Sequence, residues 1–408
     1  MDPTLRALYN AAFTEERYQS YLRRLEKMVG EPVPFPVAET PLFLPRDLRD
    51  RLAKNATEIV EQICNPALIA HTSKAVPAHL DVPNRDAFSN CIQVDFAIVR
   101  DEQGRLDGKL VELQGFPSLY GLMVLQLDAL SEEMQSIPGL NRDWSLFFGG
   151  LDRARYVETL RKAIVADYDP ETVILMDLKP EEQKTRPDFV ATKQLLGVDA
   201  ICPTTLEREG KQLYRRIGNR KVPVKRIYNR VVFDELFKTG AKLPFVYTDP
   251  LDVSWFPHPN WYWIWSKYTI PYLDHPSVPK ATFVSELKEI PDDLENYVLK
   301  PLFSFAGAGV KVDITKADID GIPDQERNGW ILQRKITYEP ALTTPDWNGV
   351  KAEVRMMFLW ADDAPRPRLV MNLVRLSRGK MLGVDHNKNL KWVGGTVGIW
   401  PASEGVSY

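Results

Sequence analysis

The sequence has few cysteines, no long apolar run and no excess of one charge, and each absence narrows the possible functions. Three cysteines occur among 408 residues, and no two form a CxxC pair, so the sequence predicts neither a disulfide framework nor a zinc site. No apolar run approaches the roughly 18 residues that a membrane span requires. The first ten residues lack the charged, apolar and small-residue zones of a signal peptide. We therefore expect a soluble, cytoplasmic globular protein.

Charge is nearly balanced over the whole chain. The chain has 52 lysine and arginine residues and 55 acidic residues. This balance does not indicate the positively charged surface that nucleic-acid-binding proteins usually have. Basic residues do cluster between Arg208 and Arg230, where they form either a wall for an anionic substrate or an ordinary solvated helix and loop. We therefore expect no nucleic-acid partner and no membrane partner.

Periodicity and turn residues predict a fold with both helices and strands. Residues 4–30 have the apolar spacing of one or two amphipathic helices, with Thr14 placed to cap the second and Gly30 to end it. A further helix is expected from Pro45 to about residue 64, where an Asn-Pro pair ends it. Residues 171–203 read as strand, helix and strand, as in an α/β layer with parallel strands, and KRIYNRVV reads as another strand.

Residues 91–115 are predicted to form a β-hairpin. Two segments of strand composition, CIQVDFAIV and KLVELQG, flank the turn residues DEQGRLDG. The position of the turn decides which side chains face one another, and the sequence leaves two positions open. One turn centres between Gln103 and Gly104, and the other lies at Asp107 and Gly108.

The first of these turns brings polar side chains together. It places Asp95 opposite Glu112 and Gln93 opposite Gln114, with Cβ atoms about 5 Å apart. Two carboxylates and an amide oxygen on one face are ligands suited to a Mg²⁺ ion that bridges phosphates. The alternative is a solvated polar face, because apolar residues alternate cleanly with the polar ones. On the first interpretation the metal ligands are Asp95, Glu112 and Gln114.

A lysine followed by a small-residue turn lies in YVLKPLFSFAGAGVKV, residues 297–312. Residues 306–309 form a turn whose backbone amides can approach phosphate oxygens, and Lys300 adds a positive charge beside them. The chain contains no GxxxxGK[ST] loop and no GxGxxG opening a helix, so this site is not of the P-loop or Rossmann type. Taken alone, the pattern is also typical of a structural turn.

The order of these motifs resembles the ATP-grasp superfamily. Upstream of the lysine stands SKYTIPYLDHPSVPKATF, and downstream stand WILQRKI and KAEVRMMFLW. The resemblance implies two α+β lobes that clamp ATP, with two lysines on its phosphates, a glycine-rich flap and a hinge strand at the adenine. The implied cofactor-binding residues are Lys267, Lys300, Ser304, Ala306, Gly307, Ala308, Gly309, Gln333, Arg334 and Lys335.

The suggested metal strands precede the nucleotide motifs in this chain. QVDFAIV and KLVELQGFPSLYGL look like the D…ExN signature of the circularly permuted members, notably glutathionylspermidine synthase, and VELQGFPSL is similar to a strand of eukaryotic glutathione synthetase. Two positions depart from the pattern. Gln114 stands where the family has asparagine, and Ser304 to Ala306 stand where the named families carry a flap glutamate.

The resemblance implies a circularly permuted ATP-grasp fold, of mixed α+β and α/β class, with a preceding substrate-binding domain. Residues 1–150 then hold the N-terminal helices and the metal-binding hairpin, residues 151–245 the α/β substrate domain, and residues 246–408 the nucleotide-binding lobes. The implied reaction is that of a ligase that activates a small-molecule or peptide carboxylate as an acyl phosphate, joins it to an amine, and uses ATP and Mg²⁺. A kinase, or a nucleotide-binding protein without catalysis, is the alternative.

Several arginines complete the candidate site. Glu353 and Arg355 lie two apart on one strand face, where Arg355 either stabilises phosphoryl charge or belongs to a structural ion pair. No Ser/His/Asp or HExxH arrangement occurs, which agrees with a reaction that needs no protein nucleophile. The candidate catalytic residues are Arg355 and Lys300, and the candidate substrate-binding residues are Arg230, Arg375 and Arg378.

Overall fold

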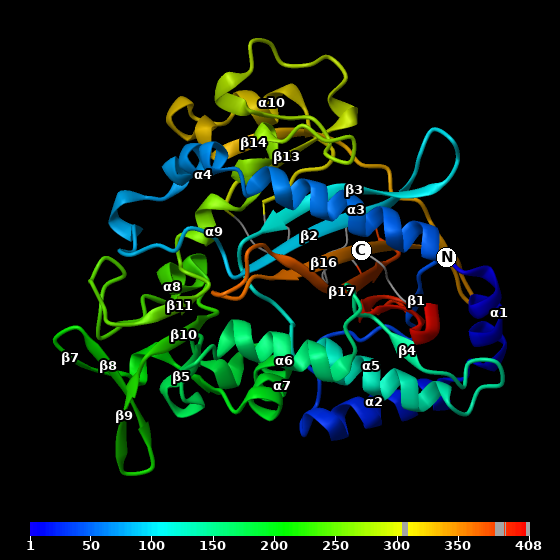
Figure 1. Cartoon of the computed structure of the whole chain (residues 1–408). Coiled ribbons are helices and arrows are strands. Elements are labelled where there is room, and N and C mark those ends of the chain that lie inside the picture. Colours follow the sequence, from blue (N-terminus) through cyan, green and yellow to red (C-terminus); the bar gives the residue numbers. More distant parts are fainter. Residues whose placement is uncertain (304–308, 380–386, 388, 405–408) are drawn as a thin grey trace.

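A computed structural model describes residues 1–303, 309–379, 387 and 389–404 of the chain. It confirms a mixed α+β fold with several sheets, in which a central antiparallel sheet lies between a small lobe and an α/β unit (Figure 1). In these ranges, no helix has both the length and the apolar composition needed to cross a membrane.

The elements that position the candidate site come from the whole length of the chain. The helices are α1 (Pro3–Ala12), α2 (Glu15–Val29), α3 (Arg46–Ile63), α4 (Pro66–Thr72), α5 (Leu122–Met134), α6 (Arg153–Ile164), α7 (Arg186–Leu196), α8 (Phe233–Thr239), α9 (Trp261–Ile264), the 3₁₀ segment η6 (Lys267–Tyr272) and α10 (Lys316–Asp320). The strands are β1 (Leu42–Phe43), β2 (Cys91–Arg100), β3 (Leu106–Gln114), β4 (Trp144–Ser145), β5 (Val173–Met176), β6 (Asp199–Ile201), β7 (Glu207–Glu209), β8 (Gln212–Ile217), β9 (Arg220–Val224), β10 (Arg226–Asn229), β11 (Ser254–Phe256), β12 (Ala281–Phe283), β13 (Tyr297–Pro301), β14 (Trp330–Arg334), β15 (Leu342–Thr343), β16 (Asn348–Leu359), β17 (Arg368–Ser377), β18 (Gly394–Thr396) and β19 (Gly398–Pro401).

The N-terminal helices begin and end at the predicted capping residues, with one exception. The Thr14 side chain accepts a hydrogen bond from the third residue of α2, and Gly30 ends that helix in the left-handed region. The Asn-Pro pair after α3 was expected only to end a helix. It also starts α4, because the Asn65 side chain caps the amide of Ala67 at 2.9 Å and Pro66 takes the first helical position.

The central sheet joins strands from both halves of the chain. Its order is β18–β17–β16–β2–β3, with β15 also paired to β16, and β16 runs antiparallel to both β2 and β17. α3 crosses one face of this sheet (Figure 1), where Val94, Phe96, Leu110 and Leu113 are buried against it. Because side chains alternate along a strand, the polar residues of β2 and β3 lie on the opposite face.

The predicted α/β layer is present. β11, β10, β5 and β6 form a parallel sheet in that order, and α7 connects β5 to β6. Beside it the meander β7–β8–β9 carries the basic cluster that follows residue 208 (Figure 1). Acidic partners offset this cluster, so it is not a cationic wall; the ion pairs are Arg208–Asp249, Arg215–Asp199, Arg216–Glu207, Arg220–Glu171 and Lys221–Glu209.

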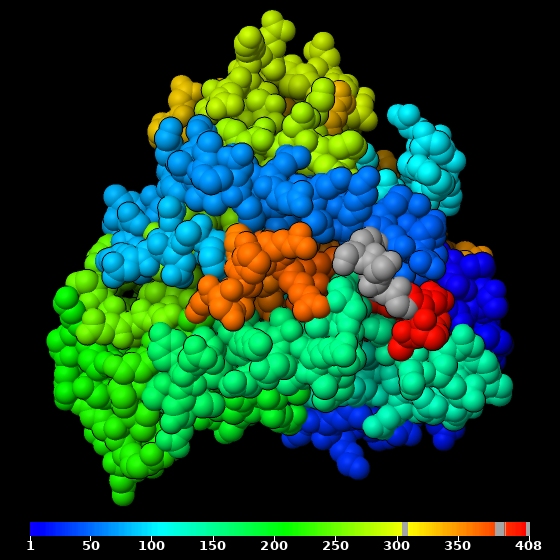
Figure 2. Space-filling model, in the orientation of Figure 1, coloured from blue at the N-terminus to red at the C-terminus, as the bar shows by residue number. Residues whose placement is uncertain are grey.

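The small lobe is built on the antiparallel sheet β12–β14–β13 and has its own apolar core. It projects from the molecule above α3 and α4 (Figure 2). Paired residues of an antiparallel sheet share a face, and Lys300 pairs with Ile331 while Val298 pairs with Gln333. Lys300 and Gln333 therefore lie on one face of the lobe sheet. Lys300 contacts β3, so this face is directed toward the central sheet.

Candidate functional site

The β2–β3 hairpin has the predicted register at its polar end. A β-bulge that was not predicted contributes to this register. Asp95 pairs with Glu112, and Gln93 with Gln114, as expected. The turn, however, centres on Gln103, and Val111 is an extra residue that shifts the register by one. Without that bulge Asp95 would face Val111. The alternative turn at residues 107 and 108 is excluded because both residues lie inside β3.

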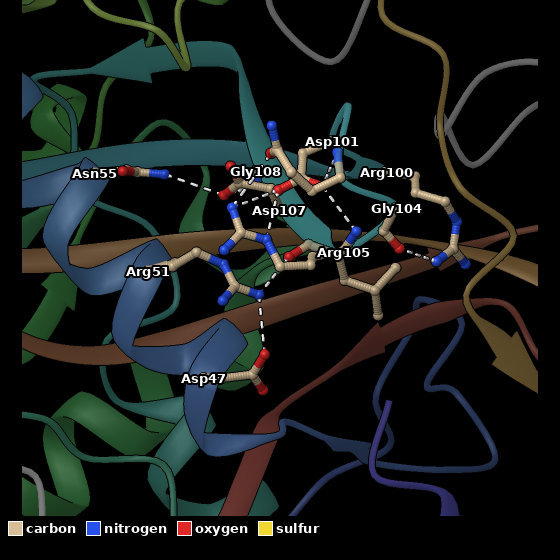
Figure 3. A network of polar contacts seen from close by, with 11 residues as sticks. Asp47, Arg51, Asn55, Arg100, Asp101, Gly104, Arg105, Asp107 and Gly108 are labelled. Carbon is tan, nitrogen blue, oxygen red and sulfur yellow. Dashed lines mark hydrogen bonds and ion pairs between the residues drawn. The ribbon is translucent and has the colours of Figure 1, made fainter.

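Polar contacts fasten the tip of this hairpin to α3 (Figure 3). Asn55 donates to the Asp107 carboxylate at 3.2 Å, and Arg51 donates to the carbonyl of Leu106 at 2.6 Å. Inside the turn, the Asp101 carboxylate accepts hydrogen bonds from two backbone amides of the turn. Anchoring the tip in this way fixes the register along the whole hairpin, because a slip of one residue would break these contacts.

Asp95 lies at the centre of a buried ion-pair network. Arg355 donates to its two carboxylate oxygens at 2.6 and 2.7 Å, and Arg375 forms a further ion pair with it. Arg375 also pairs with Glu353, whose second oxygen accepts from the Tyr338 hydroxyl at 3.0 Å. Burial acts to raise the pKa of Asp95, but the two guanidinium groups outweigh it and hold this pKa below its usual value. Both oxygens of Asp95 are therefore engaged by arginine.

Glu112, Lys267 and Lys300 converge from three distant segments. Lys267 Nζ lies 3.3 Å from Glu112 Oε1, and Lys300 Nζ donates to the carbonyl of the bulge residue Val111 at 3.1 Å. Glu112, Gln114 and Lys267 line a small cavity, about 20 Å³ in volume. Its other lining residues are Leu113, Phe116, Tyr262, Trp265, Ser266, Leu302 and Phe303.

Lys300 has an unusual electrostatic environment. Its pKa is lowered to about 8, chiefly by burial; Glu112 acts to raise this pKa, and the neighbouring Lys267 acts to lower it. The residue is 8% exposed and its ammonium group is held close to a second lysine, which is unfavourable for the protein alone. An anion bound between the two lysines would relieve this cost.

The predicted adenine strand presents one unsatisfied side chain. Gln333 on β14 is fully buried, and neither atom of its amide group has a hydrogen-bond partner in the described part of the chain. The next two side chains are engaged on the lobe surface, where Arg334 pairs with Asp293 and Lys335 with Asp313. Of the three predicted hinge residues, Gln333 alone offers side-chain hydrogen-bonding groups toward the central sheet.

The predicted flap falls mostly in a part of the chain that the structure does not describe. Ser304, Ala306, Gly307 and Ala308 lie outside the described residues. Gly309 is described and has a φ of +74°, and the backbone of Leu299 exchanges two hydrogen bonds with that of residue 311 beyond it.

The three predicted substrate arginines lie in different surroundings. Arg375 belongs to the Asp95 network. Arg230 follows β10 at the carboxyl edge of the parallel sheet, is 5% exposed, and has no hydrogen-bond partner for Nε or Nη1 within the described residues. Its guanidinium lies 5.1 Å from the ring centre of Phe116, a wall of the cavity. Arg378 instead stacks on Trp347 at 3.7 Å and donates to the carbonyl of Lys391; among the described residues it has no hydrogen bond or ion pair with Arg375.

Comparison with known proteins shows the fold. A glutathione synthetase-like effector from Globodera pallida, in its apo form, superposes with a TM-score of 0.54 at 13% sequence identity, over 92% of this chain and 95% of the effector. The chain has a glutathione synthetase-like fold. No protein family and no curated protein matches the sequence. At this identity the likeness extends to the fold and not to an activity.

Sequence reasoning missed the aromatic walls of the cavity and the tyrosine of the ion-pair network. Phe116 stands two residues after Gln114, so continued strand alternation was a usable signal for its position. Trp265 lies in an aromatic stretch whose composition does not separate cavity walls from core. Tyr338 reaches Glu353 through tertiary packing, and no spacing in the sequence reveals that contact.

A first prediction concerns Gly115, directly after β3. Its amide donates to the carbonyl of Trp265 at 2.8 Å, and an added Cβ would lie 2.8 Å from the carbonyl oxygen of Trp261. We expect Gly115→Ala to lower the free energy of unfolding by about 1–3 kcal/mol, because the aromatic segment must shift away from the hairpin. Thermal unfolding measures the effect. Gly329→Ala is the control, since a Cβ there meets no atom within 4 Å. Equal stability of the two variants would contradict this packing.

Proposed function

We propose that this chain is a circularly permuted ATP-grasp enzyme that uses ATP to activate a carboxylate as an acyl phosphate and joins it to an amine. One observation carries the proposal: Glu112, Lys267 and Lys300, from segments far apart in sequence, lie close together, and Glu112 and Lys267 line the same cavity. Their order along the chain, with the acidic hairpin before the two lysines, supports the permuted arrangement.

The nucleotide would lie between the lobe sheet and the central sheet. Lys267 and Lys300 supply two positive charges for its phosphates, as charge-assisted donors. Gln333, on the same lobe face as Lys300, carries a buried donor and acceptor that lack partners within the described residues. An adenine edge offers both complementary groups, so the unsatisfied amide fits this part of the nucleotide.

The residues present also fit a magnesium ion that accompanies the phosphates. Glu112 and Gln114 line the cavity with oxygen donors, and Mg²⁺ is usually held by one or two carboxylates together with phosphate oxygens and water. Glu112 and Gln114 would hold the ion, which when bound offsets negative charge on the phosphates. Asp95 does not line this cavity, and its oxygens are engaged by two arginines.

Arg230 is the proposed anchor for the carboxylate substrate. Its buried guanidinium has two donor groups without hydrogen-bond partners in the described chain, and it adjoins the cavity through Phe116. Burial of such donors is costly unless they meet an acceptor, and a carboxylate matches the planar fork of arginine. Ligands of open α/β sheets commonly bind at the carboxyl edge of parallel strands, where Arg230 lies.

The proposed reaction has two steps. A carboxylate oxygen attacks the γ-phosphorus, the bond to the β,γ-bridging oxygen breaks, and ADP leaves. The amine nitrogen then attacks the acyl carbon, phosphate leaves, and the nitrogen loses a proton to water. Lys267 and Lys300 stabilise the developing negative charge in both steps, while Arg355 is placed by Asp95 on the neighbouring strand.

Two other functions are alternatives to the ligase. A kinase would use the same phosphate site and stop after phosphorylating a hydroxyl group. A nucleotide-binding protein without catalysis is favoured by Gln114, in place of asparagine, and by the arginines that engage Asp95.

Hydroxylamine trapping tests the proposed function. Once a carboxylate that stimulates ADP release is found, hydroxylamine in place of the amine should yield the hydroxamate of that carboxylate. Lys267→Ala is the matched variant and should form neither ADP nor hydroxamate, because it lacks a phosphate-binding charge. AMP as the product, a stable phosphate ester, or no ATP turnover with any carboxylate would each contradict ligase chemistry.

A further inference from the structure

The cavity beside Glu112 and Lys267 is too small for the ligand that the proposed function requires. Its volume is about 20 Å³, room for roughly one water molecule, whereas sites for small molecules typically measure about 300–1,000 Å³. Gln333 is fully buried and Lys300 is 8% exposed, so the lobe face that would meet a nucleotide is covered. ATP can therefore reach these groups only if the lobe and the central sheet move apart.

Contacts between the lobe and the rest of the chain close this cavity. Lys300 on β13 donates to the carbonyl of Val111 at 3.1 Å, and the rings of Phe303 and Trp263 meet with their centres 4.8 Å apart. Val111 is the extra residue of the bulge, so it lies outside the ladder pairing of β2 and β3. Neither contact belongs to a stretch of paired strands, and the lobe has its own apolar core, so both contacts can separate while the lobe stays folded.

The chain enters the lobe through a short segment that is anchored at both ends. On the side of the central sheet, the carbonyl of Ser277 accepts a hydrogen bond from the amide of Leu110 in β3 at 2.7 Å. On the side of the lobe, the carbonyl of Lys280 accepts from the amide of Arg334 at 2.8 Å. The segment around Pro279 therefore joins the two parts.

The chain leaves the lobe through a second segment of the same kind. The amide of Lys335 donates to the carbonyl of Asn296 within the lobe at 2.8 Å, and the amide of Glu339 donates to the carbonyl of Ile98 in β2 at 2.8 Å. Between these anchors, residues 336–337 make no hydrogen bond in the described part of the chain. Short segments between two anchored parts are where hinge rotations take place.

We propose that the structure shows the lobe closed over the ATP site, and that the lobe swings away from the central sheet on two pivots, Pro279 and residues 336–337, before a nucleotide enters. This inference rests on the proposed ATP site. The swing separates Lys300 from the carbonyl of Val111, while the two linkers stay bonded to β3 and β2. The closed lobe inhibits binding, because Lys300 and Gln333 become accessible only in the open form.

Distances between spin labels test the swing. Pulsed electron paramagnetic resonance is recorded for a lobe label at Gln325→Cys paired with a label at Thr57→Cys on α3 or at Glu158→Cys on α6, all exposed positions, with the half-buried Cys64 and Cys202 replaced by serine. The β,γ-imido analogue of ATP with Mg²⁺ should shift at least one of the two distances by more than about 2 Å. Titration of the same sample shows whether the analogue binds. A bound analogue with both distances unchanged would overturn the inference. An analogue that does not bind would remove the proposed function itself, and the inference with it.

A matched pair of variants tests the second pivot. Thr337 is exposed and makes no hydrogen bond within the described residues, so its replacement removes none. Thr337→Pro fixes φ and restricts the preceding residue, whereas Thr337→Val leaves the backbone free to rotate at nearly the same size. Thr337→Pro should slow association of the analogue at least about tenfold in stopped-flow measurements, and Thr337→Val should associate at the wild-type rate. Association of Thr337→Pro at the wild-type rate would overturn the assignment of this pivot. If Thr337→Pro does not fold, the label distances decide.

Discussion

Replacing Lys300 with alanine should weaken ATP binding at least about tenfold while the protein stays folded. Lys300 is 8% exposed, and its ammonium group lies beside Glu112 and Lys267 and donates a hydrogen bond to the carbonyl oxygen of Val111. Losing one charge-assisted phosphate contact costs about 1.5–3 kcal/mol, which corresponds to a factor of ten or more in affinity. Isothermal titration of ATP measures the loss, and circular dichroism checks the fold.

Lys311→Ala is the matched control for this variant. Lys311 belongs to the same lobe but is half exposed and pairs with Asp318 at 2.7 Å on the surface. Its removal should leave the affinity for ATP unchanged. An affinity equal to wild type in Lys300→Ala would show that the phosphates do not bind at this lysine.

The pH dependence of binding gives a second readout of Lys300. Burial lowers its pKa to about 8 in the free protein, so the amine is charged below this pH and neutral above it. The affinity for ATP should therefore fall as pH rises through about 8. The Lys300→Ala variant should lose this dependence. A wild-type affinity that is constant from pH 7 to about 9 would contradict the assignment.

Replacing Gln333 with methionine should make the free protein more stable and its binding of ATP weaker. The amide is fully buried, and neither of its polar atoms has a hydrogen-bond partner within the described residues. An apolar side chain of similar shape therefore removes the free-energy cost of burying an amide without hydrogen bonds. The expected gain in free energy of unfolding is about 1–3 kcal/mol. The expected loss of affinity is about tenfold, because the adenine edge loses its hydrogen-bond partner.

Two measurements on this variant separate a ligand-binding amide from a structural one. Thermal unfolding without ligand gives the stability, and competition between ATP and GTP gives the selectivity. The variant should discriminate less between the two nucleotides. Lower stability together with unchanged selectivity would mean that Gln333 serves the lobe core instead.

Local patterns in the sequence predicted much of the scaffold of the site. The alternation in β2 and β3 gave the correct polar face, and the caps at Thr14 and Gly30 gave the correct helix ends. The register at Asp95 agreed with prediction because two effects cancelled. The turn centres half a residue earlier than expected, and the bulge at Val111 restores the pairing. No residue type in that segment indicates this bulge.

Long-range contacts were beyond what the sequence could predict. Arg355 was expected on a polar strand face, but its neighbour β2 lies about 260 residues away in the chain, so its pairing with Asp95 had no local signal. Tyr338 and Glu353 are 15 residues apart, and no local pattern in the sequence indicated their contact either. The assignment of Asp95 as a metal ligand considered only the residues of the hairpin. The arginines that pair with Asp95 come from β16 and β17. The domain boundaries and the individual site roles stay predictions.

A crystal structure with an ATP analogue and Mg²⁺ tests the central claim most directly. The account predicts phosphate oxygens within hydrogen-bonding distance of Lys267 and Lys300, an adenine edge against the Gln333 amide, and metal density at Glu112. A nucleotide bound elsewhere on the chain, or a triphosphate that touches neither lysine, would contradict it.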